Sequence, residues 1–197
     1  MVSESLNWKE AYLPTLLLWG SLGAVLGLPK FSLFSCVLQI TVLLFATYWG
    51  HVAMHTITSE SPFIIFNPHI FLHHNKSILL DRRVELFIEA LVDFYSFFTI
   101  LIAQHIFRLE LFSTSIVLYS ASLYVILHIL DYSMYGDEKH GLHHKHGCCN
   151  YEPEFMDVLF GSRCDAEAPY TDMSKEFIHA IIAFVCIGSL KLFFDLD

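Results

Sequence analysis

The chain has 197 residues, of which 55% are hydrophobic and 16% are charged, whereas ordinary soluble domains carry about 25% charged residues. This balance favours a protein embedded in a bilayer over a soluble one. The net charge of −9 argues against nucleic acid as a partner, because nucleic-acid binding requires a basic surface.

Five apolar stretches follow in chain order, at 11–28, 31–50, about 84–104, about 111–130 and 177–194. A spanning helix needs about 20 mainly apolar residues, and the second stretch meets this best because it contains no charge. The first and last stretches are shorter or interrupted, so each could instead lie along the membrane interface. Charged residues before the first stretch, with no small-residue cleavage site after it, argue against a cleavable signal peptide. The sequence therefore predicts an all-α, multi-pass membrane protein with four or five membrane helices, forming a single domain over 1–197.

Two longer polar segments, 50–83 and 131–176, fall on the same side of the membrane if the first four stretches all span it. Together with the N-terminus, that side carries eight of the eleven lysines and arginines. The opposite turns carry only Lys30 and Arg108. The positive-inside rule then predicts that the long segments form a cap that faces the cytosol.

Ten of the twelve histidines lie in these two segments or at the helix ends that enter them. Residues three and four apart share one face of a helix, and most of these histidines have that spacing. They form four groups: His51 and His55; His69, His73 and His74; His128 with Asp131 and Tyr132; and His140, His143 and His144, with His146 just beyond. His105 and His179 stand alone and are given no role.

So many imidazoles near one membrane face would be costly to bury without a metal, and would repel one another when protonated. Imidazole suits zinc, copper, iron and nickel. A single zinc ion needs three or four ligands, so nine grouped histidines are enough for two ions. No H-E-x-x-H motif is present, and a zinc-protease reading therefore lacks its general base.

Acidic residues recur at i, i+4 and i+8 on the third apolar stretch, as Glu85, Glu89 and Asp93. Acidic groups in a spanning helix are costly and usually face a cavity or a partner. Glu89 and Asp93 are therefore candidates to accept the second ring N–H of metal-bound histidines. For Glu85, a place at the polar entrance of the helix is an equally good interpretation.

The five cysteines form no C-x-x-C pair and no zinc-knuckle pattern. An odd number without a framework predicts plain reduced thiols. Cys148 and Cys149 lie beside the histidines and are weak candidates for metal ligands.

The ordered set of motifs resembles the fatty acid hydroxylase and sterol desaturase superfamily of membrane histidine-box di-iron enzymes. Its pattern is H-x-x-x-H, H-x-x-H-H, H-x-x-D-H and H-x-x-H-H, followed by N-Y-G and D-x-L-F-G-T-like stretches. The match covers 51–162, where Asn150-Tyr151 and the segment that begins at Asp157 supply the last two pieces. The second group has one extra residue between its histidines, Tyr132 stands where the family has histidine, and Glu152 replaces the glycine of N-Y-G.

The resemblance implies two iron ions, with zinc conceivable in purified protein, held by nine ligands: His51, His55, His69, His73, His74, His128, His140, His143 and His144. Further residues are implied as reserve ligands or as groups that orient the ligands: Asp131, Tyr132, His146, Glu89, Asp93, Asn150 and Asp157. The implied activity is O2-dependent hydroxylation or desaturation of a lipid, such as a fatty acyl chain or sterol, in lipid biosynthesis at the endoplasmic reticulum membrane. The chain has no nucleotide-binding glycine motif and no room for a haem domain. An electron donor in trans, of the cytochrome b5 or reductase type, is therefore implied.

Two alternatives remain open at this point. A membrane zinc-dependent lipid amide hydrolase, similar to a ceramidase, would need one three-ligand site and would leave most of the histidines idle. A metal transporter would place its ligands near the bilayer midplane, often in broken helices. The histidines here are predicted at helix ends and in loops, which favours the oxidoreductase first, the hydrolase second and the transporter last.

Overall fold

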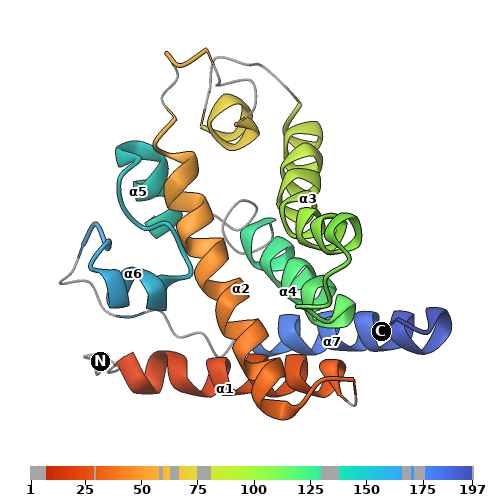
Figure 1. Cartoon of the computed structure of the whole chain (residues 1–197). Helices are drawn as coiled ribbons and strands as arrows, with labels where there is room; N and C mark the ends of the chain where they lie inside the picture. The colour runs from red at the N-terminus through yellow and green to blue at the C-terminus, as the bar shows by residue number, and fades with distance from the viewer. Residues whose placement is uncertain are drawn as a thin grey trace.

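The computed structural model describes residues 8–28, 30–57, 60–62, 67–74, 81–129, 138–165, 170 and 176–196. The regular elements within these ranges are all helical, as predicted, and Figure 1 shows their order. They are α1 (Trp8–Gly27), α2 (Leu33–Met54), the π-helix η2 (His69–His73), α3 (Arg82–Phe107), α4 (Thr114–Ile126), α5 (Glu138–His146), α6 (Glu154–Phe160) and α7 (Phe177–Phe194). Asp131 and Tyr132 lie outside the described residues.

Polar residues at the helix starts explain where several of these elements begin. The side chains of Ser32, Asp81 and Ser113 cap α2, α3 and α4, and each accepts a hydrogen bond from a backbone N–H of the first helical turn. Such caps satisfy donors that have no partner within the helix, and each contributes about 1 kcal/mol. The left-handed conformation of Arg108 (φ 53°) ends α3.

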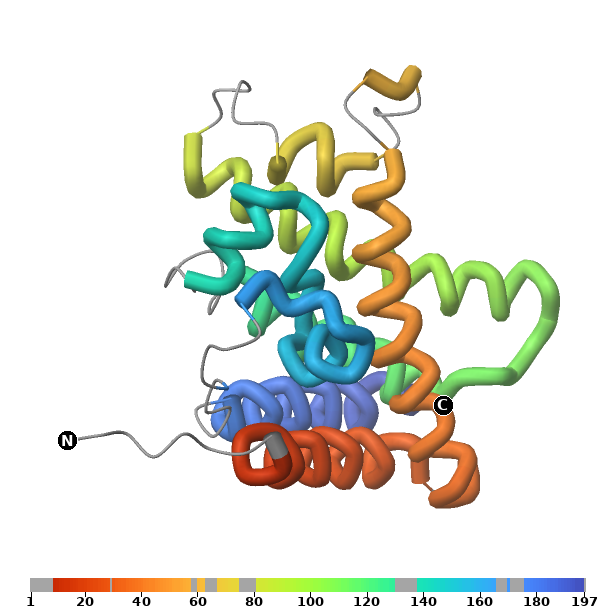
Figure 2. The backbone as a smooth tube through the Cα atoms, turned by 90° about the vertical axis from the view of Figure 1, so that its left-hand side faces the viewer, coloured from red at the N-terminus to blue at the C-terminus, as the bar shows by residue number. Residues whose placement is uncertain are grey.

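The helices divide into two regions. Helices α1 and α7 lie side by side at one end of the molecule and run crosswise to α2, as Figure 1 and Figure 2 both show. Helix α2 rises from this end toward η2 and α5 at the other. We call α1, α4 and α7 the base. The cap is η2, α5, α6 and the ends of α2, α3 and α4 that approach them.

Helix α4 packs against α1, α2, α3 and α7 and contributes to both apolar clusters of the core. One cluster joins α1, α4 and α7 around Tyr12, Trp19, Tyr119 and Ala180. The other joins α1, α2, α3 and α4 around Cys36, Ile40, Phe97, Ile116 and Val117. Through α4, the cap is tied to the base.

Three described helices are long and apolar enough to cross a membrane: α2, α3 and α7. Helix α4 is apolar but shorter, and α1 is not among the three. The prediction of a membrane protein is thus supported by composition and helix length. The count of four or five spans stays a prediction.

Candidate metal centre

All nine histidines predicted as ligands lie together in the cap. They come from four separate pieces of chain: the end of α2, the π-helix η2, the turn that follows α4, and α5. The nine histidines form three overlapping groups. Within each group, one side-chain nitrogen of every histidine lies within 4.8 Å of the corresponding nitrogens of the other members. These groups are His51, His55, His69, His74 and His143; His73, His74 and His144; and His73, His128 and His140.

Helical spacing brings the first and last histidine motifs to one face each, as the sequence predicts. Helix α2 continues past Gly50 to Met54, so the rings of His51 and His55 lie 5.2 Å apart. Helix α5 carries His140, His143 and His144, and Nε2 of His144 lies 3.0 Å from Nε2 of His140.

The extra residue of the second motif is accommodated by a π-helical turn. In an α-helix of 3.6 residues per turn, His74 would point about 140° around the axis from His69. In η2 the N–H of His74 instead donates to the carbonyl of His69, five residues earlier, at 3.1 Å. The wider turn brings His74 back over His69, and their ring centroids lie 4.8 Å apart. Single π-turns of this kind often occur at functional sites.

His128 also lies on a π-helical turn, formed by residues 127–129 at the end of α4. Its Nδ1 is 2.7 Å from Oδ2 of Asp93, which lies on α3. Glu89, one turn earlier on α3, is 2.6 Å from Nδ1 of His73 through Oε1. Both acidic residues predicted to orient histidines therefore contact them. Glu85 instead pairs with Arg82 at 2.9 Å.

Two histidines are oriented by backbone carbonyls of the segment 149–152. Nδ1 of His143 donates to the carbonyl of Cys149 at 2.7 Å, and Nδ1 of His51 donates to the carbonyl of Tyr151. A carbonyl can only accept, so the ring proton lies on Nδ1 in both cases. The lone pair of each Nε2 is then directed into the cluster.

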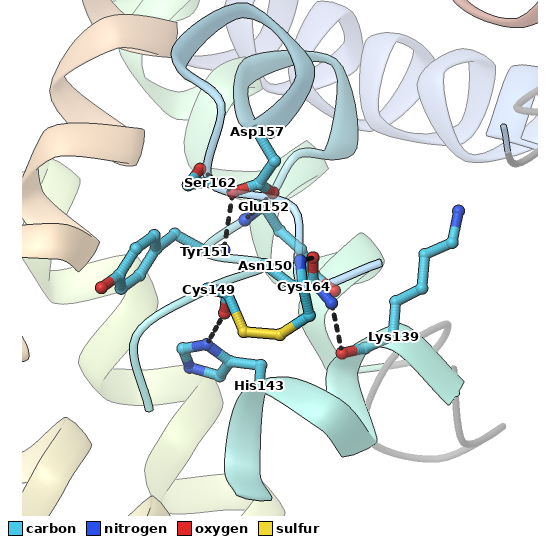
Figure 3. The surroundings of a disulfide bond; sticks show 9 residues. All are labelled: Lys139, His143, Cys149, Asn150, Tyr151, Glu152, Asp157, Ser162 and Cys164. Atoms are coloured by element: carbon cyan, nitrogen blue, oxygen red, sulfur yellow. Dashed lines mark hydrogen bonds between the residues drawn. A yellow bond between two sulfur atoms is a disulfide. The ribbon is translucent and has the colours of Figure 1, made fainter. Parts of the chain in front are cut away.

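The segment 149–152 is itself held by Asp157, as Figure 3 shows. The Asp157 carboxylate accepts from the backbone N–H groups of Tyr151 and Glu152 at 2.9 and 2.8 Å. It also accepts from the hydroxyl of Ser162. Asp157 is 1% exposed, so these hydrogen bonds lie in a dry interior where a missing partner would be costly.

Asn150 ties the same segment to its neighbours on both sides (Figure 3). Its Nδ2 donates to the carbonyl of Lys139 at 3.1 Å, and its Oδ1 accepts from the backbone N–H of Cys164 at 3.0 Å. Asn150 also has a positive φ of 51°, a conformation that asparagine tolerates better than most residues. Asn150 and Asp157 thus lie in the support of the cluster and act on it through the backbone.

The prediction of plain reduced thiols is wrong for Cys149 and Cys164, which a disulfide joins. Their Cα atoms lie 5.2 Å apart because the chain turns back after α6 and runs alongside the segment that follows α5 (Figure 3). The spacing of 15 residues gave no motif from which this pairing could be read. Cys148 is exposed, and neither it nor Cys149 belongs to a metal-ligand group among the described residues.

Several cap histidines lie outside the helices that could span a membrane, and burial lowers their pKa. The pKa of His55 falls to about 4 through burial and the neighbouring His143. The pKa of His143 also falls to about 4, chiefly through burial. Burial places the pKa of His69 and His73 well below the ordinary value. These imidazoles are neutral at pH 7 and so hold free lone pairs, the form that binds metals.

The nitrogens that face the cluster fit a metal ion. Nε2 of His51, His73, His74 and His143 is buried with no hydrogen-bond partner among the described residues. A buried polar atom without a partner normally costs about 1–3 kcal/mol, and bound metal would remove that cost at all four. The donor set is imidazole, which suits iron, zinc, copper or nickel and does not choose among them.

The remaining predicted residues fall outside this arrangement. His146 is exposed at the end of α5 and belongs to none of the three groups. His105 is exposed and His179 is half-buried on α7, and neither belongs to a ligand group among the described residues. No sequence pattern predicted that Glu152 would lie beside a histidine. Its Oε2 is nevertheless 3.6 Å from Nδ1 of His140.

An apolar pocket of about 430 Å³ lies next to the cluster, between α1, α2, α4 and the start of α6. Two of its lining residues also touch cluster histidines. The ring of Tyr124 lies 5.5 Å from that of His128, and Glu152 approaches His140. The rest of the wall is mostly apolar, with Leu16, Trp19, Ile40, Leu44, Phe97, Leu123, Phe155 and Met156 among its members.

The chain matches no protein-family model, no curated protein and no solved structure.

Proposed function

We propose that the chain is a membrane-bound oxidoreductase that uses O2 and two iron ions to hydroxylate or desaturate a lipid. The observation that carries this proposal is the convergence of nine histidines in overlapping ligand groups beside an apolar pocket. The ordered motif resemblance supports iron as the metal. The number of histidines favours two ions, because one zinc site would use only three or four of them.

The pocket supports a long apolar substrate. Its wall comes from helices that expose apolar side chains at the molecular surface, such as Leu17 on α1 and Val37 on α2. An acyl chain or sterol could reach the pocket from the bilayer and end near Tyr124 and Glu152. The apolar lining would exclude water from the reacting carbon.

The chain's own residues have three tasks in this proposal. The histidines hold the metals, Glu89, Asp93 and the 149–152 carbonyls orient the rings, and the pocket positions the lipid. The iron pair, when bound, supplies the removal of hydrogen from an unactivated C–H bond. Electrons come from a separate cytochrome b5-type or reductase-type partner.

Lipid profiling with isotopic oxygen tests the reaction. Cells that express the full chain under 18O2 should accumulate a lipid with one added 18O atom, or with one new double bond. Purified protein should be inactive alone and active with a reductase system. Turnover that continues without O2, with neither oxygen nor a double bond gained, would rule out the oxidoreductase and favour the zinc-dependent lipid amide hydrolase.

We further propose four or five spans, an endoplasmic reticulum location and a cytosolic cap. The distribution of lysine and arginine supports this orientation. The disulfide between Cys149 and Cys164 favours the opposite side, because disulfides persist mainly in oxidising compartments.

A glycosylation acceptor inserted after exposed His146 separates the two orientations. We expect it to stay unmodified in microsomes, because charge bias in short loops sets orientation. An acceptor placed beside Arg108 is the control and should be glycosylated. The reverse pattern would place the cap in the lumen and overturn the cytosolic assignment.

A further inference from the structure

The cluster has two halves that differ in the partner of the histidine Nδ1 atoms. In His73, His128 and His140, which form one ligand group, Nδ1 lies beside a carboxylate in every case. In His51 and His143, from the five-membered group, Nδ1 donates to a backbone carbonyl. The two halves therefore differ in whether the group beside Nδ1 is a carboxylate or a neutral backbone carbonyl.

The carboxylate half brings three carboxyl groups together in a buried place. Glu89, Asp93 and Glu152 are 7%, 8% and 6% exposed, and they approach the group from α3 on one side and from the 149–152 segment on the other. Oε1 of Glu89 also lies 3.3 Å from Nε2 of His128, the nitrogen that remains for a metal because Asp93 holds Nδ1 of this histidine. The Glu89 carboxylate therefore also lies close to the metal-facing side of the group. Water screens such buried carboxylates poorly.

The carbonyl half has no comparable charge. Among the residues that the structure describes, no carboxylate lies within ion-pairing distance of the histidines in the five-membered group. His55 and His69 face each other, with their Nε2 atoms 3.1 Å apart. A cation in this half would meet imidazoles of which two, His51 and His143, donate to neutral backbone carbonyls.

We propose that the two metal positions are unequal, and that the carboxylate-backed position formed by His73, His128 and His140 binds a divalent cation more tightly and fills first. The Asp93 carboxylate, which accepts the ring N–H of His128, raises the basicity of that imidazole, and the nearby carboxylates of Glu89 and Glu152 add attraction for the cation. Removal of such a partner typically lowers metal affinity 10–100-fold (about one to two orders of magnitude). The inference rests on the proposed function only in assuming two ions.

Titration of the full-length, detergent-solubilised, metal-free protein with Co²⁺ tests the inference without any enzymatic readout. The d–d absorption of Co²⁺ should develop in two steps. Glu89→Gln keeps the size of the side chain and removes its charge, so it should weaken the tighter step by about 10–100-fold and leave the weaker step unchanged. Glu85→Gln is the matched control one turn earlier on α3, where the carboxylate pairs with Arg82, and it should change neither step.

Glu152→Gln provides an independent variant outside α3, for the case that Glu89→Gln does not fold. It should also weaken only the tighter step. Two steps of equal affinity, or a shift of the weaker step alone, would overturn the inequality while leaving a two-metal oxidoreductase in place. Binding of a single Co²⁺ per chain would overturn both the inequality and the two-metal site.

Discussion

The base and the cap differ in the interactions that stabilise the interior of each. The core of the base consists of apolar side chains and small residues, such as Trp19, Leu123 and Ala180. The cap buries polar groups instead, among them His69, His143 and Asp157. Apolar packing depends on shape, whereas buried polar groups must each find a partner. The base should therefore respond to changes in volume, and the cap to changes in hydrogen bonding and metal content.

Removing one histidine of the cluster should have the largest effect on the cap. His73 belongs to two of the three ligand groups, so His73→Ala should reduce the metal content from about two ions to about one. We expect lipid turnover to fall more than about 100-fold, beyond what loss of an outer partner of a ligand costs. Metal analysis of the purified variant and lipid profiling of expressing cells measure the two effects.

His179→Ala is the matched control, because His179 lies on α7 in the base. It should keep both the metal content and the turnover. Equal losses in the two variants would show that histidine substitution damages the fold in general and that the cap has no special role.

Changing the support of the 149–152 segment tests whether hydrogen bonds hold the cap. Asp157→Ala removes the acceptor of two backbone N–H groups, at Tyr151 and Glu152. We expect a loss of stability on the order of 3 kcal/mol, because buried donors are left without partners. Hydrogen exchange should accelerate at these two amides and in α5, while α7 stays protected.

Asp165→Ala serves as the control, since Asp165 is exposed and lies outside the 149–152 segment, one residue after Cys164. It should leave exchange in α5 unchanged. Faster exchange throughout α1 and α7 in the Asp157 variant would mean that the cap and the base unfold as one unit.

The gathering of most histidines in the cap could be predicted from the sequence because their spacing is helical. His51 and His55, like His140 and His144, are four residues apart, and an α-helix alone places such pairs on one face. The acidic pair Glu89 and Asp93 could be found for the same reason. All-α architecture followed from long apolar stretches with few charges.

Other features depend on geometry that spacing does not encode. The π-turn that unites His69 and His74 adds a residue to a helical turn, and no pattern in H-x-x-x-H-H requires it. The carboxylate of Glu152 reaches His140 from twelve positions later in the chain. The crosswise path of α1 is set by tertiary packing of α1 on α2, α4 and α7, which a hydropathy pattern does not express.

A substitution in the base tests the role of shape. A Cβ added at Gly27 would come within 2.6 Å of both Cys36 Sγ and Ile116 Cδ1, and both residues are fully buried. Gly27→Ala should therefore destabilise the protein by about 1–3 kcal/mol through overpacking. Metal content should stay unchanged, because Cys36 lies in the first turn of α2, whereas His51 and His55 lie at the other end of that helix.

Gly20→Ala, on the same helix, is the matched control. No atom lies within 4 Å of the added Cβ, so this variant should be unchanged or stabilised by up to about 1 kcal/mol. Thermal unfolding in detergent measures both. Gly27→Ala with lower metal content would show that the base and the cap are coupled more tightly than the two cores indicate.

Acidification of the metal-free protein should distinguish the cap from the base, with the smallest effect of these tests. Burial lowers the pKa of His55 and His143 to about 4, whereas the unfolded value is 6.5. The unfolded chain therefore binds more protons than the folded one below pH 6.5. The stability that these two histidines contribute is fully present above pH 6.5 and is lost progressively as the pH falls toward about 4. Hydrogen exchange at pH 7 and pH 5 should show faster opening of α5 at the lower pH, with little change in α7. A cap that opens no faster at pH 5 would mean that its histidines are already protonated, or already solvated, in the folded protein.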